Sequence, residues 1–257
     1  MDCLEGMKLI SSASVDMILC DLPYGTTQNK WDSLIPLEPM WDQYRRIIRP
    51  NGAIVLTAQM PFTITLGASN LSWLKYEWVW EKPQGTGFLN AKRYPLKSHE
   101  NVLLFCSGTH TYNPQMEPGP PYTVRRKPTA SKNYGKCEQD SEIVNCGFRY
   151  RKTVLRFGTE RRGLHPTQKP VALFEYLIRT YTNPGELVLD NCMGSGTTAI
   201  ACINTDRKYM GFELDATYFT KANDRIHKHR EARETSHVSF AAPPPPQSAS
   251  LDFLFQS

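Results

Sequence analysis

The sequence predicts an α/β protein with a mostly parallel β-sheet, and three observations lead to that prediction. Apolar runs of strand length alternate with segments of helical period, which is the order typical of parallel sheets. Two of the apolar runs end abruptly in loops that contain Asp and Gly. The chain has 257 residues, 40% of them hydrophobic, which is enough for one domain that carries an insertion.

The first part of the chain, residues 1–108, is expected to contain half of this framework. A short helix should precede a buried strand that ends at Cys20, and Pro50-Asn51-Gly52 should end the next helix. After the short first helix, the expected elements in chain order are a strand at 15–20, a helix at 37–48, a strand at 53–58, a helix within 62–74, and strands at 76–80 and 101–105.

The rest of the chain divides into three segments. Residues 109–163 are rich in Pro, Gly, Lys, Arg and Tyr without hydrophobic period, so an irregular basic insertion is expected there. Residues 164–234 should complete the framework, whereas 235–257, with a run of four prolines, should be a disordered tail. The expected framework elements are a helix at 170–181, a strand at 186–190, a helix within 194–204, a strand at 209–213 and a helix from 216 to about 232.

Composition limits the classes of function. The net charge of +5 and the pI near 8.8 permit a polyanionic partner, but fit an ordinary protein surface equally well. The seven cysteines form no C-x-x-C pair, so neither a disulfide framework nor a metal site is expected, and a reducing cytoplasm is the expected location. The sequence contains no signal peptide and no apolar run of bilayer length.

A glycine-containing loop follows the expected strand at 186–190. Gly194 and Gly196 would let the backbone approach a ligand closely and would free a helix N-terminus. The dinucleotide pattern G-x-G-x-x-G is not met because Ala199 occupies its last position, so NAD is not expected. Glu213 lies at the end of the next strand, about 20 residues on, where an acid suits the two hydroxyls of a ribose.

A second loop, Asp21-Leu22-Pro23-Tyr24, carries the residues that methylation of an aromatic amine requires. The lone pair of such an amine is delocalised into its ring, so acceptors on its N–H groups are needed to make the nitrogen nucleophilic. The Asp21 carboxylate and the Leu22 carbonyl can both accept, and Pro23 stiffens the loop. Tyr24 offers a face on which an extruded base could stack, although a plain β-turn has a similar composition.

These segments resemble a known family. Asp21-Leu22-Pro23-Tyr24 resembles the Asp-Pro-Pro-Tyr signature of DNA amino-methyltransferases, with Leu22 in place of the first proline, and residues 190–197 resemble their cofactor loop. Residues 165–170, His-Pro-Thr-Gln-Lys-Pro, resemble the segment that precedes this loop in the β-class, the circularly permuted group. The resemblance runs from Asp2 to about Ile226 and is greatest to phage-type or prophage-type adenine methyltransferases.

The resemblance implies a Rossmann-like, circularly permuted methyltransferase fold with a seven-stranded sheet, in which residues 109–163 recognise the target. It implies methyl transfer from S-adenosylmethionine to adenine N6 in double-stranded DNA, after the base has been flipped out of the helix. The strand that precedes the Asp2-Cys3 segment in the family has no counterpart before Met1. The sheet therefore lacks one edge strand or the reading frame begins short.

The resemblance also assigns roles to residues. The catalytic loop is Asp21, Leu22, Pro23 and Tyr24, and the cofactor contacts are Asp2, Cys3, Asp21, His165, Lys169, Asp190, Asn191, Cys192, Gly194, Ser195, Gly196, Thr197, Glu213 and Leu214. Basic residues interleaved with aromatic ones suit phosphate and base-edge contacts, although they also fit a solvated loop. The expected DNA contacts are Lys82, Arg125, Arg126, Lys127, Lys132, Arg149 and Arg151.

Three matters stay open at this point. The target could be cytosine N4 instead of adenine, although the cytosine enzymes more often carry Ser at the Asp21 position. The chain could be a catalytically weak DNA-binding or clamp-binding protein that retains the fold. The last residues, Ser250 to Phe255, loosely resemble peptides that bind sliding clamps, and a homodimer is a further candidate assembly.

Overall fold

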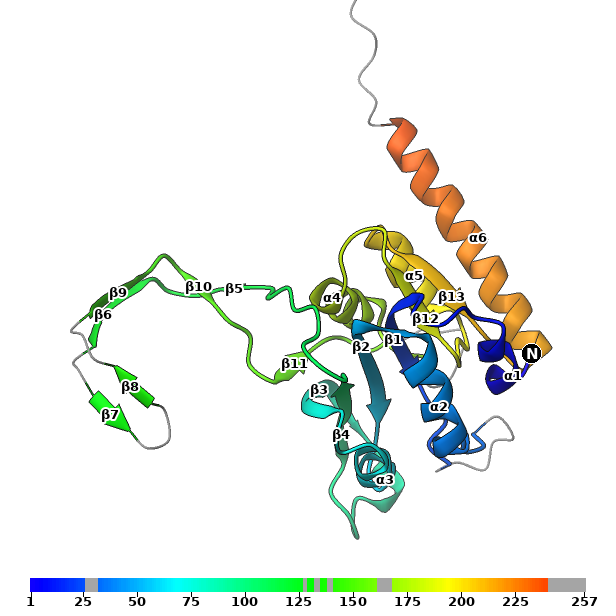
Figure 1. The fold of residues 1–257 in the computed structure, drawn as a ribbon, viewed down its shortest axis with the longest axis horizontal. Coiled ribbons are helices and arrows are strands. Elements are labelled where there is room, and N and C mark those ends of the chain that lie inside the picture. Colours follow the sequence, from blue (N-terminus) through cyan, green and yellow to red (C-terminus); the bar gives the residue numbers. More distant parts are fainter. Residues whose placement is uncertain (26–31, 127–128, 132–134, 138–140, 161–167, 240–257) are drawn as a thin grey trace, which may run out of the picture.

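The protein, represented by a computed structural model, is built around one seven-stranded sheet (Figure 1). The structure describes residues 1–25, 32–126, 129–131, 135–137, 141–160 and 168–239. The strand order is β11-β3-β4-β2-β1-β12-β13, and every neighbouring pair is parallel except the two that include β4. The predicted α/β fold with a mostly parallel sheet is therefore confirmed.

The bounds of the elements agree with the sequence pattern to within a few residues for most of the framework. The sheet consists of β1 (Val15–Asp21), β2 (Ile48–Ala58), β3 (Leu74–Thr86), β4 (Lys97–Phe105), β11 (Val154–Arg156), β12 (Leu187–Asp190) and β13 (Lys208–Gly211). The helices are α1 (Cys3–Lys8), α2 (Leu37–Ile47), α3 (Phe62–Ser69), η1 (Phe88–Asn90), α4 (Val171–Tyr181), α5 (Thr197–Asn204) and α6 (Ala216–Ser239).

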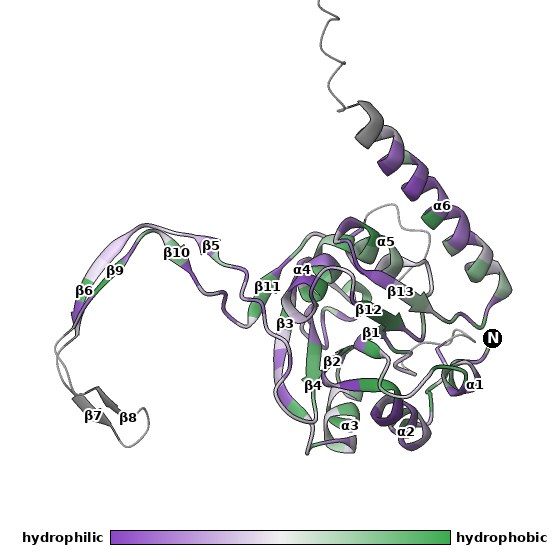
Figure 2. Ribbon diagram, turned by 45° about the horizontal axis from the view of Figure 1, so that its top comes forward, coloured by the Kyte–Doolittle hydropathy of each residue, from purple (hydrophilic) through white to green (hydrophobic). Residues whose placement is uncertain are grey.

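Period-two alternation along β1 divides the core into two layers. Ile18 and Cys20 point to one face, where they pack against α1, α2 and α3. Met17 and Leu19 point to the other face, where they pack against α4 and α5. Because both faces of the strand are covered by helices, all four side chains are fully buried, which explains the continuous apolar run in the sequence. Figure 2 shows hydrophobic colouring over the central strands.

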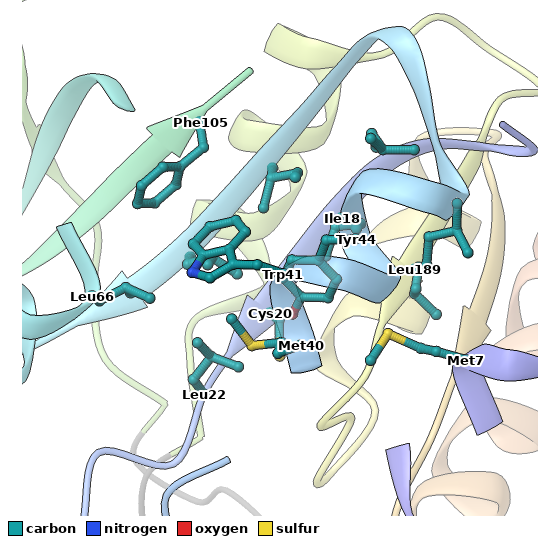
Figure 3. Close-up of a cluster of buried hydrophobic side chains, with 14 of the residues drawn as sticks. Met7, Ile18, Cys20, Leu22, Met40, Trp41, Tyr44, Leu66, Phe105 and Leu189 are labelled. Atoms are coloured by element: carbon teal, nitrogen blue, oxygen red, sulfur yellow. The ribbon is translucent and has the colours of Figure 1, made fainter. Parts of the chain in front are cut away.

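Helix α2 shows how the pattern produces the packing. Its buried residues, Met40, Trp41, Tyr44 and Ile47, follow the spacing of one helical face. Trp41 is at the centre of this layer, with its ring centroid 4.9 Å from that of Phe105, and its indole N–H donates to Ser69 Oγ at 2.8 Å (Figure 3). The two partners come from β4 and α3, so this one side chain fixes α2 against both the sheet and its neighbouring helix.

The insertion is more regular than the irregular segment that was expected. It forms short antiparallel pairs: β5 (Glu117–Pro118) with β10 (Phe148–Arg149), β6 (Tyr122–Arg126) with β9 (Ser141–Asn145), and β7 (Thr129–Ser131) with β8 (Gly135–Cys137). Together these pairs make an arm that projects away from the body of the molecule (Figures 1 and 2). Its last strand, β11, returns to the sheet and becomes the edge strand beside β3.

The two edges of the sheet show which strand is the seventh. No strand precedes α1 in the described part of the chain, and β13 is the edge strand on that side. The seventh strand is β11 at the opposite edge, and it comes from the insertion.

Helix α6 continues through Ser239, so helix extends into the segment that was expected to be a tail; residues 240–257 lie outside the described residues. None of the helices in the described ranges combines the length and the apolarity that a membrane span requires.

Replacing Trp41 should reveal how much the α2 layer contributes to stability. Trp41→Ala removes a side chain that is 1% exposed and leaves Ser69 without its donor, so the free energy of unfolding should fall by about 3–5 kcal/mol. Urea denaturation followed by circular dichroism measures this change. Leu9→Ala, at a position that is 77% exposed, is the control and should change stability by less than about 0.5 kcal/mol. Equal effects of the two substitutions would contradict the packing described here.

Candidate active site

The Asp21 carboxylate lies at the carboxyl edge of the sheet, where β1 ends. Its Oδ1 atom accepts hydrogen bonds from the Tyr24 hydroxyl at 2.8 Å and from the hydroxyl of Thr57, its register partner on β2. Its Oδ2 atom accepts from Lys169 Nζ at 2.7 Å. A carboxylate has about four acceptor positions, so the three donors found among the described residues leave one position, on Oδ2. The carboxylate is therefore fixed in place yet still able to accept one more N–H group.

Asp21 belongs to a row of four alternating charges. Lys169 Nζ lies 3.2 Å from Glu100 Oε2, and Glu100 Oε1 lies 2.5 Å from Lys82 Nζ. Lys169 is 5% exposed, and its burial alone would lower the pKa of its ammonium, but Asp21 and Glu100 outweigh burial and raise it. Burial would likewise raise the pKa of Glu100, and the two lysines outweigh it and lower the pKa. Lys169 is therefore held as an ammonium and Glu100 as a carboxylate.

The loop after Asp21 is held by packing on one side and by its tyrosine on the other. The Leu22 side chain, 3% exposed, is buried in the layer of α1, α2 and α3, which gives a physical reason for leucine where the signature has proline. The Tyr24 ring stacks on Phe62, with 5.6 Å between centroids and 28° between planes. Burial, followed by the charges of Asp21 and Glu100, raises the pKa of Tyr24 well above its usual value, so its hydroxyl stays protonated.

Glu100→Gln tests the row of charges. The variant leaves two buried ammonium groups facing one carboxylate, so the free energy of unfolding at pH 7 should fall by about 3 kcal/mol. Because the folded pKa of Glu100 is lowered, its contribution is complete above the unfolded pKa of about 4.3 and is lost as the pH falls further.

Urea unfolding of both proteins at intervals between pH 7 and pH 3 measures this dependence. The difference between the two proteins should narrow as the pH falls below about 4.3, and a difference that is constant over this range would contradict the role of the charge. Glu5→Gln, in an exposed pair with Lys8, is the matched control and should be close to neutral.

The glycine loop lies beside the Asp21 loop because β12 and β1 are parallel neighbours, with Ile18 opposite Leu189. The buried carboxylate of Asp190 accepts from Cys192 N at 3.1 Å and from the Thr198 hydroxyl, which holds the loop from both ends. Gly194 and Gly196 have φ values of +48° and +77°. A Cβ added at Gly194 would meet nothing nearer than 4.0 Å, so the backbone is open to a ligand at that point.

Glu213 and the first residues of the chain lie at the far side of the glycine loop. The Glu213 carboxylate accepts from Gly194 N at 2.8 Å, and its backbone carbonyl accepts from the Met1 ammonium at 2.8 Å. The Asp2 carboxylate caps α1 by accepting from Leu4 N at 2.9 Å. Leu214, next to Glu213, is 74% exposed, and Cys3 is buried. These residues fit a nucleoside: an acid for the ribose, open backbone at the loop and an exposed apolar side chain beside them.

Besides Glu100 of the charge row, further residues that sequence reasoning missed hold the site. Thr57 fixes Asp21 from the neighbouring strand, and Arg225 of α6 donates to the Ser195 carbonyl at 2.9 Å. Asn191 accepts at 2.5 Å from the Tyr44 hydroxyl and donates to Cys192 Sγ at 3.6 Å. Thr57 is a polar residue in an otherwise apolar run, which is a signal that could have been noticed, whereas nothing near Arg225 in the sequence points to the loop.

The raised pKa of Asp190 predicts a pH dependence of ligand binding at the glycine loop. Burial raises the pKa of this carboxyl to about 6, so it is partly protonated in mildly acidic solution. A cationic ligand at the loop favours the charged form, so the affinity for S-adenosylmethionine, the cofactor that the sequence resemblance implies, should fall by up to about tenfold per pH unit below 6. Calorimetric titration between pH 5 and pH 8 measures this affinity. Asp190→Asn should remove the dependence, and a wild-type affinity that is flat over this range would contradict it.

The expected DNA contacts lie in different places. Lys82 does not lie on an exposed surface: its side chain is 11% exposed and pairs with Glu100, because the charge row draws it inward. Arg149 stacks on Tyr122 at 4.4 Å and donates to Pro120 within the arm, and Arg151 lies 5.0 Å from the Tyr176 ring at the base of the arm. Arg125 is exposed on the arm, and Arg126 lies in β6. His165, Lys127 and Lys132 lie outside the described residues.

The parallel sheet, the glycine loop with its acid on the next strand, and the Asp-Leu-Pro-Tyr loop beside them define a Rossmann-like methyltransferase domain. The family model of the DNA methylases matches residues 15–224. The chain therefore belongs to the DNA methylase family of S-adenosylmethionine-dependent methyltransferases.

Relatives and solved structures agree with this assignment. The type II methyltransferase M1.MboII of Moraxella bovis is 28% identical over 87% of this chain and 93% of its own length. The DNA adenine methyltransferase YhdJ of Escherichia coli is 26% identical over 92% of this chain and 85% of its own. A crystal structure of the M1.HpyAVI complex with S-adenosylmethionine is similar, with a TM-score of 0.60 and 26% identity over 88% of this chain and 96% of that one.

Proposed function

We propose that the enzyme methylates the exocyclic amino nitrogen N6 of adenine in double-stranded DNA, and that it does so on a base flipped out of the helix. The observation that carries this proposal is the fixed Asp21 carboxylate, with one acceptor position left, at the edge of the sheet beside the glycine loop. YhdJ, named as an adenine methyltransferase, supports adenine, and so does Asp instead of Ser at position 21. Cytosine N4 is the alternative target.

The chain's own groups supply positioning and hydrogen bonds. The Asp21 Oδ2 atom and the Leu22 carbonyl accept the two N–H groups of the amine, which aims the nitrogen lone pair away from the ring plane toward the cofactor loop. The flipped base is proposed to stack on the Tyr24 ring, which also stacks on Phe62 and lies 5.5 Å from Lys169 Nζ. Lys169 orients the Asp21 carboxylate through the ion pair at 2.7 Å.

The cofactor contacts follow the loop geometry. When bound, S-adenosylmethionine would supply an electrophilic methyl group to the amine nitrogen. Glu213 is proposed to bind the ribose hydroxyls, with Asp2, Cys3 and Leu214 beside the nucleoside and Lys169 at the boundary with the base. Asp190, Asn191, Cys192, Ser195, Thr197 and both glycines would surround the methionine part. Asp21 need not be a strong base, because the alkylated nitrogen becomes acidic and releases its proton readily.

Further parts of the proposal concern class and assembly. The order of the halves, with the Asp21 loop before the glycine loop, supports the β-class, and the phage-type relationship is proposed from the same motifs. The exposed Arg125 supports DNA contact by the arm, residues 109–163. A homodimer, a cytoplasmic location and a sliding-clamp contact through residues 250–255 complete the proposal.

Asp21→Ala should abolish methyl transfer to DNA while binding S-adenosylmethionine with less than about a threefold change, because the glycine loop keeps its own contacts. Labelled methyl transfer and calorimetry measure the two quantities, and Lys8→Ala, an exposed position on α1, is the control. Mass spectrometry of nucleosides from wild-type product identifies the methylated base. Activity of the variant near that of the wild type would refute the role of Asp21. N4-methylcytosine in the product would show that the target base is cytosine and not adenine.

A further inference from the structure

An exposed apolar turn lies at the carboxyl edge of the sheet, beyond the active site. It connects β3 to β4 and contains η1, Phe88–Asn90. Phe88, Leu89 and Tyr94 are 74%, 86% and 68% exposed. Single exposed apolar side chains are ordinary, but three large ones within seven residues of one turn indicate a binding surface.

Backbone hydrogen bonds and two glycines define the conformation of the turn. Asn90 N donates to the Gly87 carbonyl at 3.0 Å, Ala91 N to the Phe88 carbonyl at 3.1 Å, and Tyr94 N to the Asn90 carbonyl at 3.0 Å. Gly87 has a φ of +88°, which permits the sharp entry into η1, and a Cβ at Gly85 would lie 2.7 Å from Leu96 Cβ. The backbone therefore presents the apolar tip in a defined direction.

The stem of the same hairpin enters the active site. β3 is parallel to β1 and β2, so its carboxyl end and the turn after it lie at the edge where Asp21 is located (Figure 1). Lys82 on β3 and Glu100 on β4 belong to the charge row that ends at Asp21. The tip is thus connected to the catalytic loop through two short strand segments.

The charge around the tip selects its partner. Lys92, Arg93 and Lys97 are exposed, and the sequence has no acidic residue between Glu81 and Glu100. An apolar tip surrounded by cations complements DNA, whose stacked bases are lined by phosphates.

We propose that Phe88 and Leu89 form a wedge that inserts into the duplex at the position vacated by the extruded target base, while Lys92 and Arg93 contact the flanking phosphates. This inference rests on the proposed extrusion of the base from double-stranded DNA. It assigns the extrusion step to the β3–β4 turn, which contributes no group to the chemistry itself.

The double variant Phe88→Ala, Leu89→Ala is assayed on two duplexes that contain the sequence methylated by the wild-type enzyme. One duplex is fully paired, and the other has an abasic site opposite the target, which lowers the cost of extrusion. The variant should lose about tenfold or more in kcat/KM on the paired duplex and stay within about twofold of wild type on the abasic one. Leu71→Ala, at an exposed position before the opposite end of β3, is the matched control and should behave as wild type on both.

Two outcomes would overturn the wedge: equal losses on the two duplexes, which indicate a general DNA contact or a folding defect, or no loss on either. Fluorescence of 2-aminopurine at the target position gives a second readout. It should rise when wild-type enzyme binds the paired duplex, and should rise less with saturating double variant. A wild-type enzyme that methylates only single-stranded DNA would refute the proposed duplex substrate. That result differs from the two outcomes that overturn the wedge alone, so the two proposals can fail separately.

Discussion

The parallel pairing of β1 with β12 is the constraint on which the site depends. The two strands are separated by more than 160 residues, yet their register places the end of one beside the end of the other. Parallel strands present their carboxyl ends at the same edge, so the Asp21 loop and the glycine loop emerge side by side. Any shift by one residue would turn Ile18 and Cys20 toward the opposite helical layer, and the cost of that repacking fixes the register.

The buried charges show how a polar site is compatible with this core. Two carboxylates and two ammonium groups alternate, so each charge in this row has a partner of opposite sign. An unpaired charge at this depth would cost several kcal/mol, whereas in a complete row each charge is compensated by its neighbours, which also keep it in one position. Lys169 matters most in this respect, because it joins the segment before α4 to the loop after β1, 148 residues apart. The electrostatic network therefore reinforces the contact that the strand pairing establishes.

Local pattern predicted the framework well because the helices and strands of an α/β core leave strong periodic signals. The runs around Ile18 and Leu189, the amphipathic face of α2 and the two motif loops were all readable from the sequence. The seventh strand was missed because β11 has three residues, of which only Leu155 is buried. Such a strand exists by pairing with β3, and its own sequence carries too little information to predict it.

The candidate site was predictable where one loop carries the chemistry, and unpredictable where partners come from afar. Asp21 and Tyr24 follow from the motif, but the position of Lys82 depends on Glu100, which lies on another strand and pairs with it only in the folded hairpin. Lys82 was expected to contact DNA, which stays a prediction, and its partner in the fold is an acid 18 residues later. Arg225 is a similar case, since its contact with Ser195 exists only because α6 packs over the glycine loop.

The cost of extruding a base can be compared with the free energy that the exposed turn could return. Extracting a base from the stack costs a few kcal/mol per step. Burial of a large apolar side chain returns about 1.5–3 kcal/mol. One buried side chain therefore does not offset the cost of extrusion, whereas two on a turn of defined conformation return a free energy of the same order as that cost. Rigidity matters because a mobile turn would lose part of this gain to ordering. A hairpin whose stem is already fixed by the charge row avoids that loss, so the groups that orient Asp21 also hold the tip that would open the DNA.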